Sequence, residues 1–523
     1  MTLAVLVEQV VQRWGDQTGV VEGDERLTYR ELVTLGWGAV RHIAAAIQDP
    51  RPRVAVVMDN RWEYFALDVG LAAAGGTLVR CNARDSAADL AHILRDSQAH
   101  AVVHSAEHRD TVAVALGARA GEVLRIELPA REDGGRRPAL EDLGRACAGA
   151  PPPVDVDDHD PYRLMYTSGT TGVPKGVVVT HDQWRAAVLE HLYLGPLRDV
   201  RQEARLLHVT PLSHVAGGLF WPFMLTGATQ VVAPTADVAA AAELIAREAI
   251  THTFLVPTLV HRLLDLDPSQ QNALASLERV YYAASPIDPQ RLSEAVARFG
   301  SIFAQGYGST EAMWWLTYLS PEEHATALAA GDDRRLSSCG RPSLGVPIRL
   351  IDDVGHPVAT GELGEVATRG RHVALSYWGR GDVPRDADGP SAGWFRTGDL
   401  GYADDAGYIH LMDRKSELIV SGGFNVYPRE VELALGTHPD IAECCVVGVP
   451  DEDWGEVVAA VVVPAAGRSV DTRLIEDFGR HALAGYKRPR LVVVRDELPL
   501  TANGKVDRKA LRAGFWAGRD RSI

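Results

Sequence analysis

The stretch LMYTSGTTGVPKGVVVTH, residues 164–181, carries the densest signal in the sequence. The residues before Thr167 and after Lys175 have the apolar pattern of short strands, so the loop between them joins two strands. Small and hydroxyl-bearing residues fill this loop, and they let the backbone approach a polyphosphate and add hydrogen-bond donors. Lys175 adds a compact positive charge. The stretch therefore predicts a phosphate-binding loop between two strands.

This loop differs from the Walker loop of many nucleotide-binding proteins. The Walker motif reads G-x-x-x-x-G-K-[ST] and opens a helix. Here the glycines stand at 169, 172 and 176, and a strand follows. The alternative interpretation is a flexible surface turn, and the full string TSGTTGVPKG argues against it.

TSGTTGVPKG resembles the signature loop of the adenylate-forming (ANL) superfamily, which holds acyl- and aryl-CoA synthetases, peptide-synthetase adenylation domains and luciferases. The similarity runs in order from LTYREL (27–32) to LTANGKVDRKALR (500–512). In detail the chain is most similar to fatty-acyl or aryl CoA synthetases, through SSCGRPSLGVPIRLID (337–352) and SGGFNVYP (421–428). The resemblance implies an ATP-dependent, AMP-forming ligase that activates a carboxylic acid as an acyl adenylate and passes the acyl group to coenzyme A.

The resemblance also implies a set of nucleotide and thiol ligands. Tyr307 would lie against adenine, Thr310 would bind the α-phosphate, and Asp399 and Arg414 would reach the ribose hydroxyls. The glycine pair at 422 and 423 would let the pantetheine arm of coenzyme A pass close to the backbone. The complete implied set is Thr167, Ser168, Gly169, Thr170, Thr171, Lys175, Ala284, Ser285, Gln305, Gly306, Tyr307, Gly308, Ser309, Thr310, Asp399, Arg414, Gly422 and Gly423.

Glu311 and Thr170 resemble the family's magnesium site. A hard cation that bridges phosphates takes oxygen ligands and few protein groups, which suits Glu311 directly after the turn G-Y-G-S-T. The alternative for Glu311 is a solvated surface acid, the commoner fate of a lone glutamate.

Three residues are implied as catalytic: Lys505, Thr310 and His214. Lys505, in LTANGKVDRKALR, would contact the substrate carboxylate and the α-phosphate; the alternative is a solvated lysine. His214, in PLSHVAGG (211–218), would gate the acyl pocket or orient the carboxylate, against the alternative of a satisfied structural histidine. SHVAGG offers no carboxylate to pair with an ammonium group, which argues against an amino-acid substrate.

The sequence departs from the family pattern at two positions. Many relatives carry Asp or Lys at the hinge position that Ser416 occupies, and many carry Gly where Ala283 stands. The first departure affects the equilibrium between the two orientations of the carboxyl-terminal domain, and the second affects the shape of the acyl pocket. Met313, Trp314 and Trp315 either crowd this pocket or pack in the core.

Alternating helical and strand patterns over the first four hundred residues predict an α/β fold with largely parallel sheets. We expect a large amino-terminal domain of layered sheets and helices at residues 1–413. Residues 414–523 are expected to form a small, mobile α+β domain that carries Lys505. The segment 151–161 is expected to be a stiff acidic linker, and 112–150 is expected to be variable surface.

Composition limits the possible partners. The chain has 523 residues, 46% of them hydrophobic, and a net charge of −16, which argues against binding to nucleic acid or to an anionic membrane surface. No apolar run reaches the length of a membrane span, and the first residues lack the pattern of a signal peptide. Five cysteines without metal-ligand spacing fit free thiols in a reducing cytoplasm. We expect a monomer or a homodimer.

Several functions stay open at this point. The leading hypothesis is an acid–CoA ligase that uses ATP, Mg²⁺ and coenzyme A. A second is a stand-alone acyl-AMP ligase that loads an acyl-carrier protein, and a third is an enzyme that performs one half-reaction. A nucleotide-binding regulator without turnover is disfavoured by the implied set of Thr310, Glu311, Asp399, Arg414 and Lys505.

Overall fold

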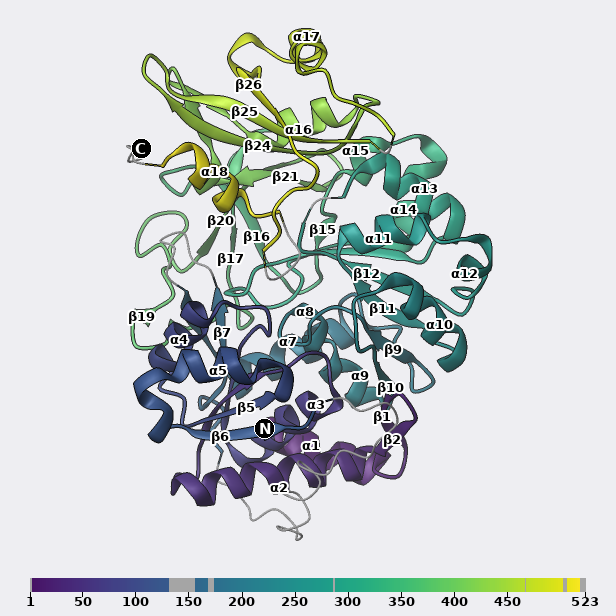
Figure 1. Cartoon of the computed structure of the whole chain (residues 1–523), viewed down its shortest axis with the longest axis vertical. Helices are drawn as coiled ribbons and strands as arrows, with labels where there is room; N and C mark the ends of the chain where they lie inside the picture. Colours follow the sequence, from purple (N-terminus) through teal and green to yellow (C-terminus); the bar gives the residue numbers. More distant parts are fainter. Residues whose placement is uncertain are drawn as a thin grey trace. The chain divides into compact units, whose positions relative to one another are not determined.

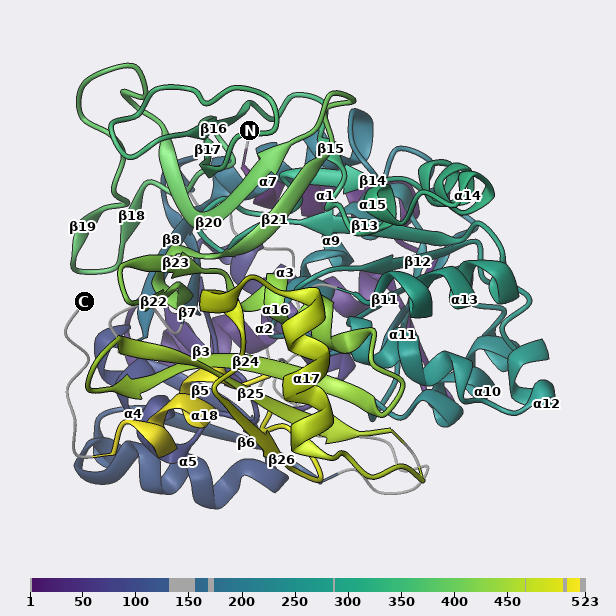
Figure 2. The ribbon, with the colours of Figure 1, turned by 90° about the horizontal axis from the view of Figure 1, so that it is seen from above.

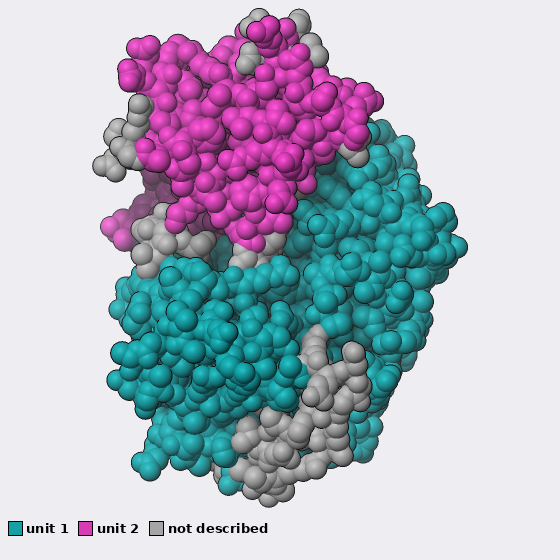
Figure 3. All heavy atoms as spheres, viewed as in Figure 1, with its two compact units in different colours: residues 1–348, 368–385, 393–395 teal, residues 349–367, 386–392, 396–523 magenta. Residues whose placement is uncertain are grey.

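A computed structural model describes residues 2–130, 156–167, 174–285, 287–465, 467–501 and 506–517. The chain divides into two compact units, coloured separately in Figure 3. Unit 1 comprises residues 1–348, 368–385 and 393–395, and unit 2 comprises 349–367, 386–392 and 396–523. That the moving domain begins after residue 413 stays a prediction.

An eight-stranded sheet in unit 1 carries the quoted loop. The two strands that flank the loop are antiparallel neighbours. On one side of this pair the four further strands of the sheet are parallel, and on the other side the two short strands are antiparallel. The strand order is β19 (Gly381–Asp382), β18 (Ser376–Tyr377), β8 (Lys175–Thr180), β7 (Pro161–Thr167), β4 (Thr77–Arg80), β3 (Arg53–Val57), β5 (Ala101–Ser105) and β6 (Leu124–Leu128).

A nine-stranded sheet forms the rest of the β-structure of unit 1. Its central strands are parallel, as the alternating pattern predicts, and its edges are antiparallel. The order is β15 (Arg341–Pro342), β14 (Thr317–Leu319), β13 (Phe303–Tyr307), β12 (Arg279–Tyr282), β11 (His252–Leu255), β9 (Arg205–His208), β10 (Thr229–Val232), β1 (Thr18–Glu22) and β2 (Glu25–Thr28).

Helices cover these sheets in layers (Figures 1 and 2). Alternate residues of a strand point to opposite faces, so β3 places Val54 and Val56 in one core cluster and Ala55 and Val57 in another. The helices of unit 1 are α1 (Leu3–Trp14), α2 (Tyr29–Ile47), α3 (Trp62–Ala74), α4 (Ala87–Asp96), α5 (Arg109–Leu116), α7 (His181–Tyr193), α8 (Val215–Gly218), α9 (Phe220–Thr226), α10 (Val238–Glu248), α11 (Pro257–Leu264), α12 (Pro268–Asn272), α13 (Pro289–Phe299), α14 (Pro321–Ala330) and α15 (Asp333–Leu336).

The expectation of variable surface over 112–150 is wrong for its first part. Residues 109–116 form α5 and residues 124–128 form β6, which extends the parallel sheet next to β5. Val112 and Leu128 are fully buried. Figures 1 and 2 both show α5 beside α4, and the two helices share one core cluster against the sheet. Alanine-rich composition conceals such a helix, because small apolar residues bury as readily as they line a surface.

Unit 2 contains a four-stranded and a five-stranded sheet. The four-stranded sheet has the order β16 (Ile348–Ile351), β17 (Gly364–Thr368), β20 (Phe395–Ala403) and β21 (Ile409–Arg414). In the five-stranded sheet β23 (Phe424–Val426), β22 (Ile419–Ser421), β25 (Gly455–Pro464) and β24 (Ile441–Asp451) follow one another, and β26 (Leu491–Val494) pairs with β25.

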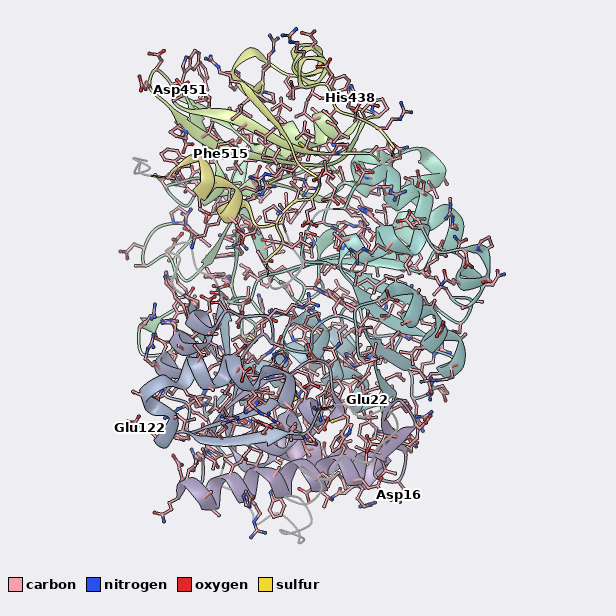
Figure 4. All side chains as sticks on the ribbon, viewed as in Figure 1. Asp16, Glu22, Glu122, His438, Asp451 and Phe515 are labelled. Atoms are coloured by element: carbon pink, nitrogen blue, oxygen red, sulfur yellow. The ribbon has the colours of Figure 1, made fainter. Side chains whose placement is uncertain are left out.

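The five-stranded sheet of unit 2 is covered on both faces. Along β24, Val446 points to a cluster with α16 (Pro428–Gly436) and α17 (Thr472–Ala482), whereas Cys445 and Val447 point to a cluster with α18 (Arg508–Phe515). Phe515, labelled in Figure 4, lies on α18 and packs against this second cluster. The α+β unit expected near the carboxyl end is therefore present.

The cysteines and the helices bear on two further expectations. Cys81, Cys339 and Cys445 are buried free thiols and Cys444 is a half-buried one, while Cys147 lies outside the described residues. None of the described helices combines the length and the apolar character that a bilayer crossing requires.

Candidate functional site

The phosphate-loop motif lies between β7 and β8, as predicted. Thr167 and Lys175 pair across the two strands at the mouth of the loop. Four predicted ligands, Ser168, Gly169, Thr170 and Thr171, lie outside the described residues. Lys175 is half-buried, and its ammonium nitrogen lies 5.6 Å from the ring centre of Tyr377.

Glu311, the predicted metal ligand, is held at both its main chain and its side chain by the segment that contains β18. The backbone nitrogen of Ala374 donates to the Glu311 carbonyl at 2.7 Å. The hydroxyl of Tyr377 donates to Oε1 of Glu311 at 3.2 Å. Burial and the adjacent Glu311 carboxylate raise the pKa of Tyr377, so the hydroxyl remains a donor at neutral pH. Carboxylate and hydroxyl oxygens fit the preference of Mg²⁺ for oxygen ligands.

The turn that carries Glu311 requires its glycines. A β-carbon at Gly306 would lie 2.3 Å from Cγ of Trp315, and one at Gly308 would lie 1.7 Å from the carbonyl oxygen of Trp314. The turn also holds itself together, because the backbone nitrogen of Ala312 donates to the Ser309 hydroxyl at 3.1 Å. The chain can therefore reverse directly after β13.

The remaining predicted residues of this motif stand at the end of β13. Gln305 is buried, and its amide oxygen accepts from the Tyr282 hydroxyl at 3.2 Å. Tyr307 and Thr310 are half-buried. Their position past the carboxyl end of a parallel strand is where α/β proteins commonly bind ligands.

Residues 283–285 follow β12, the neighbour of β13. Ala283 is buried in the core cluster that contains Trp315. Ala284 has a φ of 82°, in a region that non-glycine residues rarely adopt. Strained backbone of this kind concentrates at functional sites, and the roles of Ala284 and Ser285 stay predictions.

His214 is held by side chains that the sequence analysis missed. The Arg80 guanidinium donates to the carbonyl oxygens of Leu212 (3.2 Å) and His214. The side-chain amide nitrogen of Asn82 lies 2.9 Å from Nε2 of His214. Asn60 accepts from the backbone nitrogen of Leu212 at 2.9 Å. Asn60, Arg80 and Asn82 stand at or just after the carboxyl ends of β3 and β4, and that position is the signal that could have identified them.

Gly218, four residues after His214, lies beside a pair of tryptophans, Trp184 and Trp314. A β-carbon at Gly218 would lie 3.3 Å from Cη2 of Trp184 and 3.6 Å from Cζ2 of Trp314. The two indole rings are 5.7 Å apart, and Trp314 has a φ of 71°. Among the described residues, neither indole N–H has a hydrogen-bond partner. Of the residues 313–315, Met313 and Trp315 are buried in the core, whereas Trp314 is half-buried.

Asp399 and Arg414, both predicted to bind ribose, face each other in unit 2. They are paired residues of the antiparallel strands β20 and β21, and Nε of Arg414 lies 3.2 Å from Oδ1 of Asp399. Asp399 is largely buried, whereas the Arg414 side chain is more than half exposed. An acidic acceptor and a basic donor thus stand together, and each can hydrogen-bond to a hydroxyl.

The segment after Arg414 contains the predicted hinge and the predicted thiol-facing glycines. Ser416 lies in the 3₁₀ turn Lys415–Glu417, between two ion pairs: Lys415 with Asp353 at 2.7 Å and Glu417 with Arg508 at 3.4 Å.

Gly422 and Gly423 form the turn between β22 and β23. Their φ values of 57° and 82° favour glycine. A β-carbon at Gly422 would meet Trp454, whereas one at Gly423 would stand in open space. Lys505 lies outside the described residues.

The structure thus assembles the predicted residues in two groups. In unit 1, Tyr377 connects Glu311 with Lys175 at the mouth of the phosphate loop. In unit 2, the strand pair β20–β21 unites Asp399 with Arg414. Carboxylates and cations in these arrangements can bind a polyphosphate and the diol of a ribose.

Comparisons with known proteins agree with this geometry. The AMP-binding enzyme family matches residues 7–378, and the AMP-binding enzyme C-terminal domain matches residues 430–505. The medium/long-chain-fatty-acid–CoA ligase FadD8 of Mycobacterium tuberculosis is 41% identical over 74% of this chain and 67% of its own. Feruloyl-CoA synthase of an Amycolatopsis species is 35% identical over 95% of this chain and 96% of its own. The ATP-bound structure of MatB from Rhodopseudomonas palustris superimposes with a TM-score of 0.85 and 27% identity, over 98% of this chain and 99% of MatB.

Proposed function

Because the chain belongs to the adenylate-forming family of AMP-binding enzymes and is an AMP-forming acid–CoA ligase, we propose that its site residues divide two half-reactions between them. In the first, a carboxylate oxygen attacks the α-phosphorus of ATP, the bond to the bridging oxygen breaks and pyrophosphate leaves. In the second, the thiol sulfur of coenzyme A attacks the acyl carbon, the thiol proton is released and AMP leaves. A free carboxylate cannot acylate a thiol, because its leaving group would be oxide.

The first half-reaction brings two anions together, so it needs positive charge where charge develops. Lys175 stands at the mouth of the phosphate loop, and Glu311 is the residue that would hold Mg²⁺, whose charge offsets that of the phosphates. Asp399 and Arg414 take the ribose hydroxyls, and Lys505 contacts the carboxylate and the α-phosphate. The observation that carries this proposal is the hydrogen bond from Tyr377 to Glu311, which ties the metal carboxylate to the strand beside the phosphate loop.

The second half-reaction uses the turn at Gly422 and Gly423. The space beside Gly423 is open, as a turn that passes the pantetheine arm requires. The ion pair between Lys415 and Asp353 joins the expected moving domain to residues before it, so breaking and remaking this pair would accompany rotation between the two poses. Glu417 and Arg508 both lie within 414–523, so their pair would move with that domain.

We further propose that the acid has a planar ring placed against Trp184 and Trp314. Two indoles at an angle of 57° give a planar acyl group favourable edge and face contacts. Feruloyl-CoA synthase, which aligns over nearly its whole length, acts on the aryl acid ferulate. FadD8 acts on medium- and long-chain fatty acids, so a saturated chain is the competing substrate.

A panel of acids tests these proposals. Benzoic, cinnamic and indole acids are compared with saturated fatty acids of six to sixteen carbons, and pyrophosphate release is measured with and without coenzyme A. Aryl acids should give the higher kcat/KM, and a reverse order would contradict the substrate class. Thioester formed with a carrier protein but not with coenzyme A would identify the carrier protein as the acceptor.

A further inference from the structure

The orientation of the Asn82 side chain is determined by its contacts. Asn82 is only 6% exposed. Its Oδ1 accepts from the backbone nitrogen of Arg84 at 3.0 Å. A backbone N–H can only donate, so the amide oxygen must face Arg84 and the amide nitrogen must face His214. The 2.9 Å contact with Nε2 of His214 is therefore made by an N–H donor.

The main chains of both residues are held as well. The backbone nitrogen of Asn82 donates to Oδ2 of Asp85 at 3.0 Å, and the backbone nitrogen of Asp85 donates back to the Asn82 carbonyl at 3.0 Å. The buried Arg80 guanidinium holds the carbonyl oxygen of His214. The amide and the imidazole thus meet in a geometry set by other contacts.

A donor opposite Nε2 determines the protonation of the imidazole. Nε2 must accept, so the ring proton of neutral His214 is on Nδ1. A second proton, on Nε2, would place two donors 2.9 Å apart. Two charged residues from the described part of the chain contact this pair, Arg80 at the His214 carbonyl oxygen and Asp85 at the Asn82 backbone. The guanidinium of Arg80, which holds the His214 carbonyl oxygen, disfavours a positive ring. The Asp85 carboxylate accepts from the backbone nitrogen of Asn82, and burial raises the pKa of this carboxyl to about 6.

We propose that Asn82 is a positioning residue that keeps His214 neutral and protonated at Nδ1, so that His214 donates a hydrogen bond to the acid and does not act as a base. This role rests on the proposed function, in which His214 lies at the acyl site. The acid must react as a carboxylate, and a neutral donor can orient a carboxylate without exchanging its proton. An unrestrained histidine would titrate near pH 6.5, so Asn82 removes the titration of His214 from the pH dependence of adenylation.

The N82D variant tests the proposal, because aspartate has the same shape and the opposite hydrogen-bonding character. One carboxylate oxygen can still accept from Arg84, and the other now accepts from Nε2–H. Ring-labelled histidine is followed by NMR in the wild type, N82D and N82A, with the His214 signal assigned by its loss in H214N. N272D, which changes an exposed asparagine on α12 of the same unit, is the matched control.

We expect the wild-type ring to show the Nδ1–H tautomer at neutral pH and N82D to show Nε2–H or the imidazolium. Pyrophosphate release by N82D should fall by roughly tenfold or more. It should also acquire a titration above pH 6.5 that the wild type lacks, because the new carboxylate stabilises the imidazolium. A wild-type ring protonated at Nε2, or a tautomer unchanged in folded N82D, would overturn the proposal.

The tautomer is read without any acid bound, so it does not depend on the proposed function. If the tautomer is as expected but N82D leaves pyrophosphate release and its pH profile unchanged, His214 does not act at the acyl site. That outcome overturns the functional part of the proposal. If N82D fails to fold, the wild-type tautomer alone still decides the first part.

Discussion

The hydroxyl of Tyr377 donates a hydrogen bond to Oε1 of Glu311 at 3.2 Å. The two residues are 66 positions apart in the sequence, and β18 brings them together by pairing with β8, where Tyr377 stands opposite Val177. The Tyr377 ring also lies 5.6 Å from the ammonium of Lys175. One residue therefore connects the candidate metal carboxylate with the strand that leaves the phosphate loop.

Tyr377→Phe should weaken the binding of MgATP. The substitution keeps the ring beside Lys175 and removes one donor to a carboxylate, a contact worth about 1.5–3 kcal/mol. The KM for MgATP in pyrophosphate release should therefore rise by roughly tenfold or more. Tyr193→Phe, at an exposed tyrosine of α7, should change nothing. An unchanged KM in Tyr377→Phe would mean that Glu311 does not hold the metal.

Asp399→Asn should remove the ability to distinguish ATP from its deoxyribose analogues. The pair with Arg414 across β20 and β21 places a carboxylate where ribose hydroxyls would bind. We expect kcat/KM for ATP to fall by roughly tenfold to a hundredfold, while kcat/KM for 2′-deoxy-ATP and for 3′-deoxy-ATP falls little. Asp405→Asn, at an exposed turn residue of the same unit, serves as the control. Equal losses for all three nucleotides would argue against a ribose contact.

Lys505→Ala and Gly423→Ala should affect opposite half-reactions. Lys505→Ala should lose most pyrophosphate release from acid and ATP but still convert a supplied acyl adenylate to the thioester. Gly423→Ala should retain adenylation and lose thioester formation, because the methyl group enters the open space beside the turn.

Backbone strain at residue 423 needs its own control, because Gly423 has a φ of 82°. Gly467→Ala should cause comparable strain, because Gly467 has a φ of 71°. An added methyl group there would also stand in open space, and the residue belongs to the same unit. Each substitution should destabilise by about 1–2 kcal/mol. If Gly467→Ala slows thioester formation as much as Gly423→Ala does, strain and not access explains the loss.

Much of the fold could be predicted from the sequence because the strands are short apolar runs separated by helical patterns. The strands on both sides of the quoted loop, the helix Pro428–Gly436 and the long strands β24 and β25 stand where their patterns indicate. The failure at residues 112–128 arose in part because alanine made the half-buried helix α5 look like surface. The strand β6 at the end of the sheet mixes charged and apolar residues and is mostly half-buried.

The site was predictable only where a motif is contiguous. Asp399 and Arg414 come from two motifs that the sequence already assigned to ribose, and the structure shows them in contact. Tyr377 and Asn82 have no such signal. The position of Tyr377 depends on the pairing of β18 with β8, and Asn82 contacts His214, which lies 132 positions later in the sequence. Long-range contacts of this kind leave no local pattern of charge or hydrophobicity.

Asp413, directly before Arg414, should make stability depend on pH. Burial raises the pKa of Asp413 to about 7, and its carboxylate accepts from the backbone nitrogen of Arg429 at 2.7 Å. In the unfolded chain an aspartate titrates near 3.9. The folded state therefore binds more protons between about pH 4 and pH 7, so this contribution to stability is complete below about pH 4 and is lost as the pH rises through 7.

Asp413→Asn keeps the acceptor for Arg429 and removes the titration. The urea midpoint of the wild type should fall relative to that of Asp413→Asn as the pH rises from about 4.5 to about 7.5. When the two urea midpoints are compared at the same pH, the contributions of the titratable groups that both proteins share cancel. A constant difference between the two midpoints would show that Asp413 titrates normally in the folded protein.

Gly218→Ala should change which acids the enzyme accepts. The added methyl would lie 3.3 Å from Trp184 and 3.6 Å from Trp314, so the indoles must shift or the space beside them must shrink. If the acid binds against these indoles, KM should rise most for the bulkiest rings and least for small acids, while the KM for ATP stays constant. Gly121→Ala, which adds a methyl in open space, should leave the order of acids unchanged. A uniform loss across the acid panel would instead indicate a packing defect, because a defect in the core does not discriminate between substrates.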